Sequence, residues 1–197
     1  MKELVFATNN AHKLEELRRI AGEGFRILSL SDIGCHDDIP EDADTIAGNA
    51  LAKARWVANR YRCACFADDT GLEVDAVGGA PGVHTARYAG GDGHDSQANM
   101  ALLLKNLAGI PAGERTARFR TVIALIDENG AEHCFHGICE GSILTQKQGE
   151  AGFGYDPVFL PQGCDRSFAQ LSPDEKNAIS HRGRAARQFL AFINSDK

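Results

Sequence analysis

Hydrophobic and polar positions follow two different periods along the first third of the chain. The apolar run from Glu3 to Ala7 predicts a short strand that ends at the polar residues 8–10. Apolar residues from Leu14 to Ala21 then recur at helical spacing among charged ones, which predicts a helix. The same spacing predicts a second helix from about Thr45 to Tyr61. We expect its buried face to carry Leu51, Ala54, Val57, Ala58 and Tyr61.

The next segment predicts two strands on either side of a polar turn. Cys63 to Ala67 is short and apolar, and it stops at the sequence Asp68-Asp69-Thr70-Gly71. Beyond that turn, apolar residues alternate with acidic ones from 72 to 76, as in a half-buried strand. A glycine-rich loop follows over 78–94, and Asp95 or Ser96 would cap the next helix.

Strand-like and helical segments alternate through the second half of the chain as well. Arg118–Asp127 and Glu132–Ile138 flank the turn residues 128–130, which predicts a β-hairpin. Residues 172–175 form a capping box with proline at the first helical position, and a last helix begins at about Ser180. Because no single strand–helix–strand rhythm runs through the chain, we expect a mixed α/β fold with one long central sheet flanked by helices.

The composition is that of a globular domain. The 197 residues are 43% hydrophobic and 24% charged, which argues against a disordered chain. The length predicts one domain over residues 1–197, or two small lobes that share a cleft. Lysine and arginine number 21 against 27 aspartates and glutamates, so the formal net charge is −6. Nucleic acid is therefore not an expected partner, because binding to phosphate backbones depends on clustered lysine and arginine.

The sequence carries no signal for a membrane or for export. No apolar run approaches the roughly 20 residues of a membrane span, and a strand-like run stands where a signal peptide would begin. We therefore expect a cytoplasmic protein without a membrane partner. The 6 cysteines form no CxxC pair, so we expect free, buried thiols rather than a zinc site or disulfides.

Four polar clusters follow apolar elements, where α/β folds place their sites. The first is Thr8-Asn9-Asn10-Ala11-His12-Lys13, between the first strand and the first helix. The free N–H groups of a helix start favour an anion, and a hydroxyl, two amides and a lysine beside them suit a polyphosphate. A plain helix cap with a solvated Lys13 is an equally good interpretation of this segment alone.

The second cluster is acidic. Asp68 and Asp69 stand side by side at the expected end of a strand, and a hard divalent cation would offset their repulsion. Asp-Asp-Thr-Gly is also good turn chemistry, so a simple turn stays open as an interpretation. Glu41, Asp42 and Asp44 supply further carboxylates before the second helix, where helix N-terminal charge alone would account for them.

The other two clusters combine glycine, aromatic and cationic residues. Gly152-Phe153-Gly154-Tyr155-Asp156-Pro157 lets the backbone approach a ligand while a ring stacks on it, although it would also serve as a plain corner. Lys176, His181 and Arg182 lie within seven residues at a helix junction. Arg182 can bind a carbonyl or phosphate through two parallel bonds, and a solvated helix face is the alternative. Together the four clusters predict nucleoside triphosphate chemistry with Mg²⁺.

In their order and spacing these segments resemble the inosine/xanthosine triphosphate pyrophosphatases, a family that removes deaminated purine nucleotides. The resemblance is carried by the segments 8–13, 67–72, 81–88, 152–157 and 180–183. It extends over about residues 3–193, nearly the whole chain.

The resemblance implies an elongated fold in which a long mixed sheet separates two lobes, with the nucleotide in the cleft between them. It also implies a homodimer, Mg²⁺, and hydrolysis of ITP, dITP and XTP to the monophosphate and pyrophosphate. Asp69 would bind the metal and act as the general base, and Glu41 would be a second metal-linked carboxylate. The residues expected to hold the substrate are Thr8, Asn9, Asn10, Ala11, His12, Lys13, Thr70, Phe153, Gly154, Tyr155, Asp156, Lys176, His181 and Arg182.

One departure from the family pattern and two alternative functions bear on this interpretation. Gly48-Asn49-Ala50 stands where relatives commonly have Glu-Asn-Ala, so no metal ligand is expected at position 48. A septum-inhibitor-type pyrophosphatase of modified nucleotides is one alternative, and the segment 180–182 argues against it. A non-catalytic nucleotide sensor is the other, but a sensor has no need of the base that Asp69 would supply.

Overall fold

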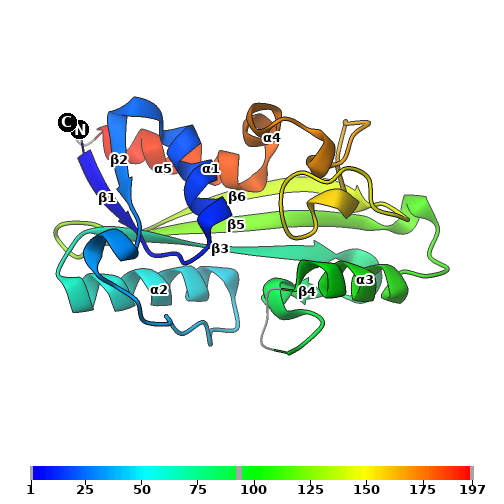
Figure 1. Cartoon of the computed structure of the whole chain (residues 1–197), viewed down its shortest axis with the longest axis horizontal. Helices are drawn as coiled ribbons and strands as arrows, with labels where there is room; N and C mark the ends of the chain where they lie inside the picture. The colour runs from blue at the N-terminus through cyan, green and yellow to red at the C-terminus, as the bar shows by residue number, and fades with distance from the viewer. Residues whose placement is uncertain (1, 92–94, 196–197) are drawn as a thin grey trace. The chain divides into compact units, whose positions relative to one another are not determined.

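The computed structural model describes residues 2–91 and 95–195, and it has the mixed α/β fold that the sequence predicts (Figure 1). Its 7-stranded sheet has the order β2-β1-β3-β5-β6-β7, with β4 paired to β3. β1 pairs parallel with β2 and with β3. β4 pairs antiparallel with β3, and β7 pairs antiparallel with β6.

The strands are β1 (Lys2–Phe6), β2 (Phe25–Leu28), β3 (Cys65–Val74), β4 (Pro81–Gly82), β5 (Thr116–Ile126), β6 (Glu132–Ile143) and β7 (Phe159–Pro161). The α-helices are α1 (Ala11–Ala21), α2 (Ile46–Tyr61), α3 (Ser96–Asn106), α4 (Pro173–Ile179) and α5 (His181–Ser195).

The chain divides into two compact units. The first unit consists of Met1–Asp69, Thr121–Gly137 and Arg182–Lys197, and the second of Thr70–Arg120 and Ile138–His181. Strands β3, β5 and β6 each contribute residues to both units.

The core of the first unit is built from β1, β3, α1 and α5. The ring of Phe66 stacks on that of Phe6 with 4.5 Å between centroids, and the centroid of Phe189 of α5 lies 4.7 Å from that of Phe66. Leu17 of α1 is fully buried in the same cluster. Helix α2 lies on the other side of β3 from α1 (Figure 1). Since aromatic rings bury large apolar areas, this cluster fixes α1 and α5 against one face of the strands.

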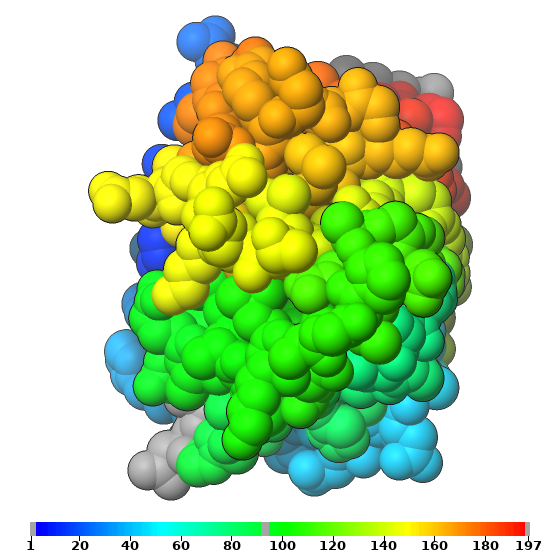
Figure 2. Space-filling view, turned by 90° about the vertical axis from the view of Figure 1, so that its right-hand side faces the viewer, coloured from blue at the N-terminus to red at the C-terminus, as the bar shows by residue number. Residues whose placement is uncertain are grey.

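The core of the second unit joins α3 to aromatic residues of β5, β7 and the loop before α4. Phe119 contacts Phe159 and Phe168, with centroids 4.7 and 6.1 Å apart. Met100, Leu103 and Leu107 belong to the same cluster. Figure 2 shows the face on which α3 and its neighbours (green) lie beside the segment around Lys147 (yellow), and Lys147 donates a hydrogen bond to Gln97 there.

The predicted turn at Asp68–Gly71 is wrong. β3 continues without a break from Cys65 to Val74, so the two strands expected on either side are one strand. The carboxylates remain within a buried strand because cationic side chains compensate them, as described below. The expected strand through 76 ends at Val74, and 75–77 form a 3₁₀ turn.

Further differences concern short elements and the orientation of one helix. β2 and β4 were not predicted, because four and two residues carry too little periodicity. The loop expected over 78–94 contains β4 and a 3₁₀ turn at Thr85–Arg87, and its residues 92–94 lie outside the described residues. The buried residues of α2 are Ile46, Asn49, Ala50, Lys53, Ala54 and Val57, so the predicted face is rotated by about one position.

The expected caps of α3 and α4 are confirmed. Asp95 and Ser172 cap these helices with their side-chain oxygens, and Glu175 completes the predicted capping box. Asn10 and Thr45 cap α1 and α2 in the same way. All six cysteines are free. Only Cys35, Cys65 and Cys139 are buried, however, and Cys134 is exposed, contrary to the prediction. Among the helices of the described residues, none has the length and apolarity to span a bilayer.

Candidate functional site

The segment 8–13 forms the turn between β1 and α1, where the free N–H groups of the helix begin. The Thr8 hydroxyl accepts the Asn10 N–H at 3.2 Å, and Asn10 Oδ1 accepts the Lys13 N–H at 3.1 Å. Asn9, Ala11 and His12 are exposed along the same turn. Both proposed roles of this segment are therefore compatible: a helix cap is present, and the turn presents amide and hydroxyl groups at a helix N-terminus, which favours anions.

Lys13 is not solvated but paired with Asp68. Its Nζ lies 2.9 Å from Asp68 Oδ1, and its side chain is 14% exposed. Asp68 is fully buried, and its second oxygen accepts from Arg182 Nε at 3.1 Å. Burial raises the pKa of Asp68, but the charges of Lys13, Arg182 and Lys53 outweigh it and hold the pKa well below its ordinary value. Asp68 is therefore a permanent anion that fixes two cations.

Arg182 connects Asp68 to α1. Its Nη1 donates to Glu16 Oε2 at 2.5 Å, and the guanidinium is almost completely buried. Burial lowers the pKa of Arg182, whereas Glu16 and Asp68 raise it above its ordinary value. Two of the guanidinium nitrogens thus serve carboxylates of the protein, which fixes the orientation of the group.

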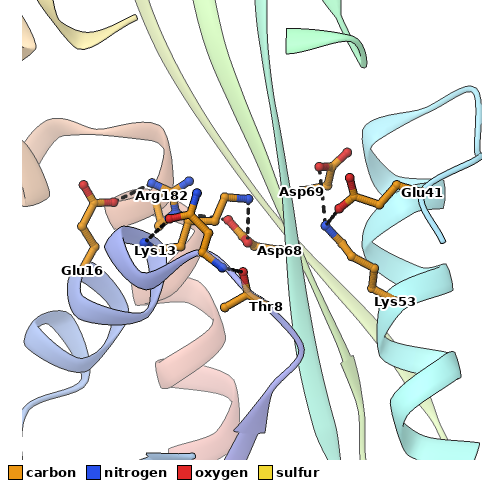
Figure 3. A network of polar contacts seen from close by, with 9 residues as sticks. Thr8, Lys13, Glu16, Glu41, Lys53, Asp68, Asp69 and Arg182 are labelled. Carbon is orange, nitrogen blue, oxygen red and sulfur yellow. Dashed lines mark hydrogen bonds and ion pairs between the residues drawn. The ribbon is translucent and has the colours of Figure 1, made fainter. Parts of the chain in front are cut away.

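Asp69, the next residue of β3, faces the other side of the strand, as alternation of side chains requires (Figure 3). Its Oδ1 lies 3.7 Å from Lys53 Nζ, and within the described part of the chain its buried Oδ2 has no hydrogen-bond partner. Burial raises the pKa of Asp69 above its ordinary value, against the opposing charges of Lys53 and Lys13 and with the help of Glu41 and Asp68. A buried carboxylate with an open oxygen and a raised pKa is suited to accept a proton or a cation.

Glu41 and Lys53 complete this group (Figure 3). Glu41 Oε1 accepts from Lys53 Nζ at 2.5 Å, so one lysine bridges the carboxylates of Glu41 and Asp69. Burial lowers the pKa of Lys53, but Asp69, Glu41 and Asp68 raise it above the ordinary value. Lys53 was not predicted as a site residue. Its position next to Ala54, which was expected on the buried face of α2, was the one sequence feature that could have indicated a buried lysine.

The donors in this group fit Mg²⁺, although no cluster of three His, Cys, Asp or Glu side chains suited to a metal occurs among residues 2–91 and 95–195. Mg²⁺ is usually held by one or two carboxylates together with substrate phosphates and water. Asp69 Oδ2 is a buried oxygen in need of a partner, and Glu41 stands across Lys53 from it. The ion pairs of this cluster join four carboxylates (Glu16, Glu41, Asp68, Asp69) to three cationic side chains (Lys13, Lys53, Arg182). The excess of negative charge favours the binding of a further cation.

A second group of site candidates lies in the second unit, around Asp156. Asp156 is buried, and its Oδ2 accepts the Phe153 N–H at 2.9 Å and Lys176 Nζ at 2.7 Å. The ammonium of Lys176 stands 4.9 Å from the centre of the Phe153 ring. Gly152 has a positive φ of 77°, and a Cβ there would meet Asp156 Oδ2 at 2.1 Å. Glycine is therefore required for Asp156 to hold the loop and the lysine together.

The other candidates of the second unit are placed by the same core. Tyr155 is buried and donates from its hydroxyl to the Thr85 carbonyl at 2.9 Å, and burial raises its pKa. His181 is buried and stacks on Phe119 at 4.5 Å. Gly154 adopts a positive φ of 61°, and Thr70 is half-buried within β3.

The structure thus assembles the predicted residues into two groups, one in each unit. Thr8–Lys13, Glu41, Asp69 and Arg182 belong to the first unit, and Thr70, Phe153–Asp156, Lys176 and His181 to the second. A helix N-terminus beside paired carboxylates and buried lysines is typical of proteins that act on phosphorylated ligands.

Comparison with known proteins identifies the family. The model of the Ham1 family matches residues 4–192, so this chain belongs to the Ham1 family. It is 53% identical to the dITP/XTP pyrophosphatase of Porphyromonas gingivalis, with 98% of each chain covered. It is 50% identical to the dITP/XTP pyrophosphatase of Christiangramia forsetii, over 98% of this chain and 99% of the relative.

Solved structures agree with this assignment. The Staphylococcus aureus Ham1 protein superimposes with a TM-score of 0.88 at 35% identity, and both chains are covered completely. A nucleoside-triphosphatase / dITP/XTP pyrophosphatase from Mycobacterium abscessus gives a TM-score of 0.76 at 42% identity, over 95% of this chain and 98% of that one. The predicted family resemblance is confirmed.

Proposed function

We propose that this chain hydrolyses ITP, dITP and XTP to the nucleoside monophosphate and pyrophosphate, and so removes deaminated purines from the nucleotide pool. The observation that carries the proposal is Asp69, a buried carboxylate with a raised pKa and an open oxygen in the group that also holds Lys13 and Lys53. Two relatives about half identical to this chain over almost their full length are dITP/XTP pyrophosphatases.

Asp69 is the general base in this proposal. Its carboxylate takes the proton of the water that attacks phosphorus, the bond to the leaving pyrophosphate breaks, and water is consumed as monophosphate and pyrophosphate form. A carboxylate with a raised pKa is a stronger base than an ordinary one, and burial supplies that shift here. Lys53 keeps the carboxylate oriented through its contact with Oδ1.

Lys13 and the α1 N-terminus would hold the phosphates. Asp68 keeps Lys13 in position at the start of the helix, where N–H groups and the ammonium face the same turn. Lys176 would contribute a second ammonium to the substrate. Fixed cations of this kind stabilise charge that develops on phosphate oxygens and on the leaving pyrophosphate.

Asp69 and Glu41 are the residues that would hold Mg²⁺. When bound, Mg²⁺ would offset the polyphosphate charge and polarise the phosphorus–oxygen bonds. The group already contains more carboxylates than cationic side chains, and a triphosphate would add further negative charge. The bound cation would reduce the repulsion between the two.

The purine would be bound by Phe153–Asp156, Lys176 and His181, with Arg182 reading the base. Hypoxanthine and xanthine carry O6, whereas adenine carries an amine at the same position. A buried donor such as Arg182 would face another donor if adenine entered, which is costly. Glu16 and Asp68 support this role because they hold the guanidinium in one orientation.

We further propose that residues 1–197 act as one domain and that the chain forms a homodimer, as the family resemblance implies. The nucleotide cleft between two lobes stays a prediction, as does a cytoplasmic location.

The proposed function is tested by incubating the purified protein with Mg²⁺ and ITP, dITP, XTP, ATP or GTP, and resolving pyrophosphate from orthophosphate. We expect pyrophosphate from the first three nucleotides and little turnover of ATP and GTP. Orthophosphate as product, or equal use of ATP, would overturn the proposal. Intact ITP bound after incubation with Mg²⁺ would identify a sensor instead.

A further inference from the structure

The carboxylate of Glu41 stands on a segment without regular structure. Residues 41–45 form neither helix nor strand between an exposed loop and the start of α2. The Glu41 side chain is 32% exposed, although its carboxylate meets the buried Lys53. A metal-linked carboxylate needs a fixed position, and an irregular exposed segment supplies one only when neighbouring groups hold its backbone.

Asn49 supplies such a hold. Its side chain is buried in α2, and its Oδ1 accepts the N–H of Ala43 at 2.9 Å. Since a backbone N–H can only donate, the amide oxygen must face it. The bond fixes the peptide two residues after Glu41 against the helix.

Gly48 makes this close approach possible. A Cβ at position 48 would lie 2.9 Å from Ala43 Cβ and 2.9 Å from Thr45 Oγ1. With the segment in its present position, a Cβ at position 48 would require Ala43 or Thr45 to shift. The glycine also donates its N–H to Thr45 Oγ1 at 3.0 Å, which caps the helix where the segment ends.

Asn49 and Lys53 act on the same segment from the same face of α2, because residues four apart lie one turn above each other. Lys53 holds the Glu41 carboxylate at 2.5 Å, and Asn49 holds the backbone that carries it. Lys53 also contacts Asp69. The position of the segment 41–45 therefore sets the distance between the carboxylates of Glu41 and Asp69.

We propose that Asn49 is a positioning residue of the hydrolytic group: through the Ala43 peptide it keeps the Glu41 carboxylate beside Lys53 and Asp69, where Mg²⁺ would be held. Asn49 touches neither substrate nor metal. The inference rests on the role of Glu41 in the proposed function.

The test uses Asn49→Ala in the full chain with two measurements. In metal-free protein we expect the Ala43 amide to exchange with solvent about fivefold faster or more, as loss of a hydrogen bond implies. In ITP hydrolysis we expect the Mg²⁺ concentration for half-maximal rate to rise about tenfold, while kcat at saturating Mg²⁺ stays within about twofold of the wild type. An unchanged Mg²⁺ requirement overturns the proposal.

Asn99→Ala is the matched control. Asn99 is an equally buried asparagine in α3, and its Oδ1 accepts the Ala89 N–H at 2.7 Å. It holds a loop that carries no proposed metal ligand. Because Asn99 Nδ2 also donates to the Ala86 carbonyl at 3.0 Å, we expect Asn99→Ala to lower stability at least as much as Asn49→Ala and to leave the Mg²⁺ requirement unchanged. Equal shifts in both variants would show a general loss of stability and overturn the proposal.

Glu41→Gln separates this inference from the proposed function. If Asn49 acts through Glu41, adding Asn49→Ala to Glu41→Gln produces no further rise in the Mg²⁺ requirement, whereas independent effects multiply and overturn the inference. A wild type that releases no pyrophosphate refutes the proposed function itself. An active wild type with a Glu41→Gln variant of unchanged Mg²⁺ requirement refutes the inference alone.

Gly48→Ala tests the same positioning of Glu41 if Asn49→Ala does not fold. It leaves Asn49 intact but places a Cβ against Ala43. We expect the same faster exchange at Ala43 and the same higher Mg²⁺ requirement, and wild-type values for both would overturn the proposal.

Discussion

Asp68 and Asp69 are neighbours in β3, yet their carboxylates lie on opposite sides of the strand and have opposite pKa shifts (Figure 3). Asp68 is buried between Lys13 and Arg182, which hold its pKa below the ordinary value although burial raises it. Burial dominates at Asp69, which keeps one oxygen without a hydrogen-bond partner among the described residues. Two adjacent carboxylates whose environments separate their pKa values are suited to different roles, one as a structural anion and one as a base.

Replacing Asp69 tests the role of the base. We expect Asp69→Asn to lower kcat by about 10²- to 10⁴-fold, because a positioned general base contributes that much. The free energy of unfolding should change by less than about 1 kcal/mol, since Oδ2 makes no hydrogen bond to lose and Lys53 keeps its closer partner Glu41. Steady-state kinetics and urea denaturation measure the two quantities. Turnover close to that of the wild type would remove Asp69 as the base.

Replacing Asp68 should lower stability far more than replacing Asp69. Asp68→Asn leaves Lys13 and Arg182 buried without their shared anion, so we expect a loss of about 3–5 kcal/mol in the free energy of unfolding. The measurement is denaturant unfolding beside Asp69→Asn under the same conditions. Equal stability of the two variants would contradict the distinct roles of these carboxylates.

Gly152 should be needed for substrate binding, and the hairpin offers a matched control. Gly152→Ala adds a Cβ 2.1 Å from Asp156 Oδ2, which forces Asp156 away from Phe153 and Lys176. We expect KM for ITP to rise at least tenfold, a cost of about 1.4 kcal/mol. Gly130 has a similar φ of 80° with nothing within 4 Å, so Gly130→Ala carries the same backbone strain alone. A similar KM for both variants would show that strain, rather than the Asp156 contact, matters.

The stability of the fold should depend on Glu175 in acid. Hydrogen bonds from Arg166 and Ser172 lower the pKa of Glu175 from 4.5 to about 2. Because the folded pKa lies below the unfolded one, the stabilisation is complete above pH 4.5 and is lost as the pH falls toward about 2. Glu175→Gln keeps a residue that can complete the capping box but has no carboxyl group to titrate. The urea concentration at the midpoint of unfolding should therefore fall less steeply with decreasing pH in this variant than in the wild type. Parallel pH profiles for both proteins would contradict the assignment.

Much of the fold could be predicted from local pattern. The predicted caps Asp95 and Ser172 stand where a polar residue precedes an amphipathic run, and both were confirmed. β2 was missed because its partner β1 stabilises it, and no periodicity of its own marks four residues. The face of α2 was misplaced because a buried asparagine and a buried lysine read as solvent-facing in a hydrophobic pattern.

The sequence by itself determined the family, the order of elements and the residue types of the candidate site, since these are local or recur as motifs. Only the tertiary structure decided that Asp68 and Asp69 stay within one strand, because their compensation comes from residues far away in the chain, Lys13, Lys53 and Arg182. It also decided that Lys53 joins Glu41 to Asp69 and that Asn49 holds the segment before α2. Charges placed side by side by folding set one another's pKa values, and no local pattern contains that information.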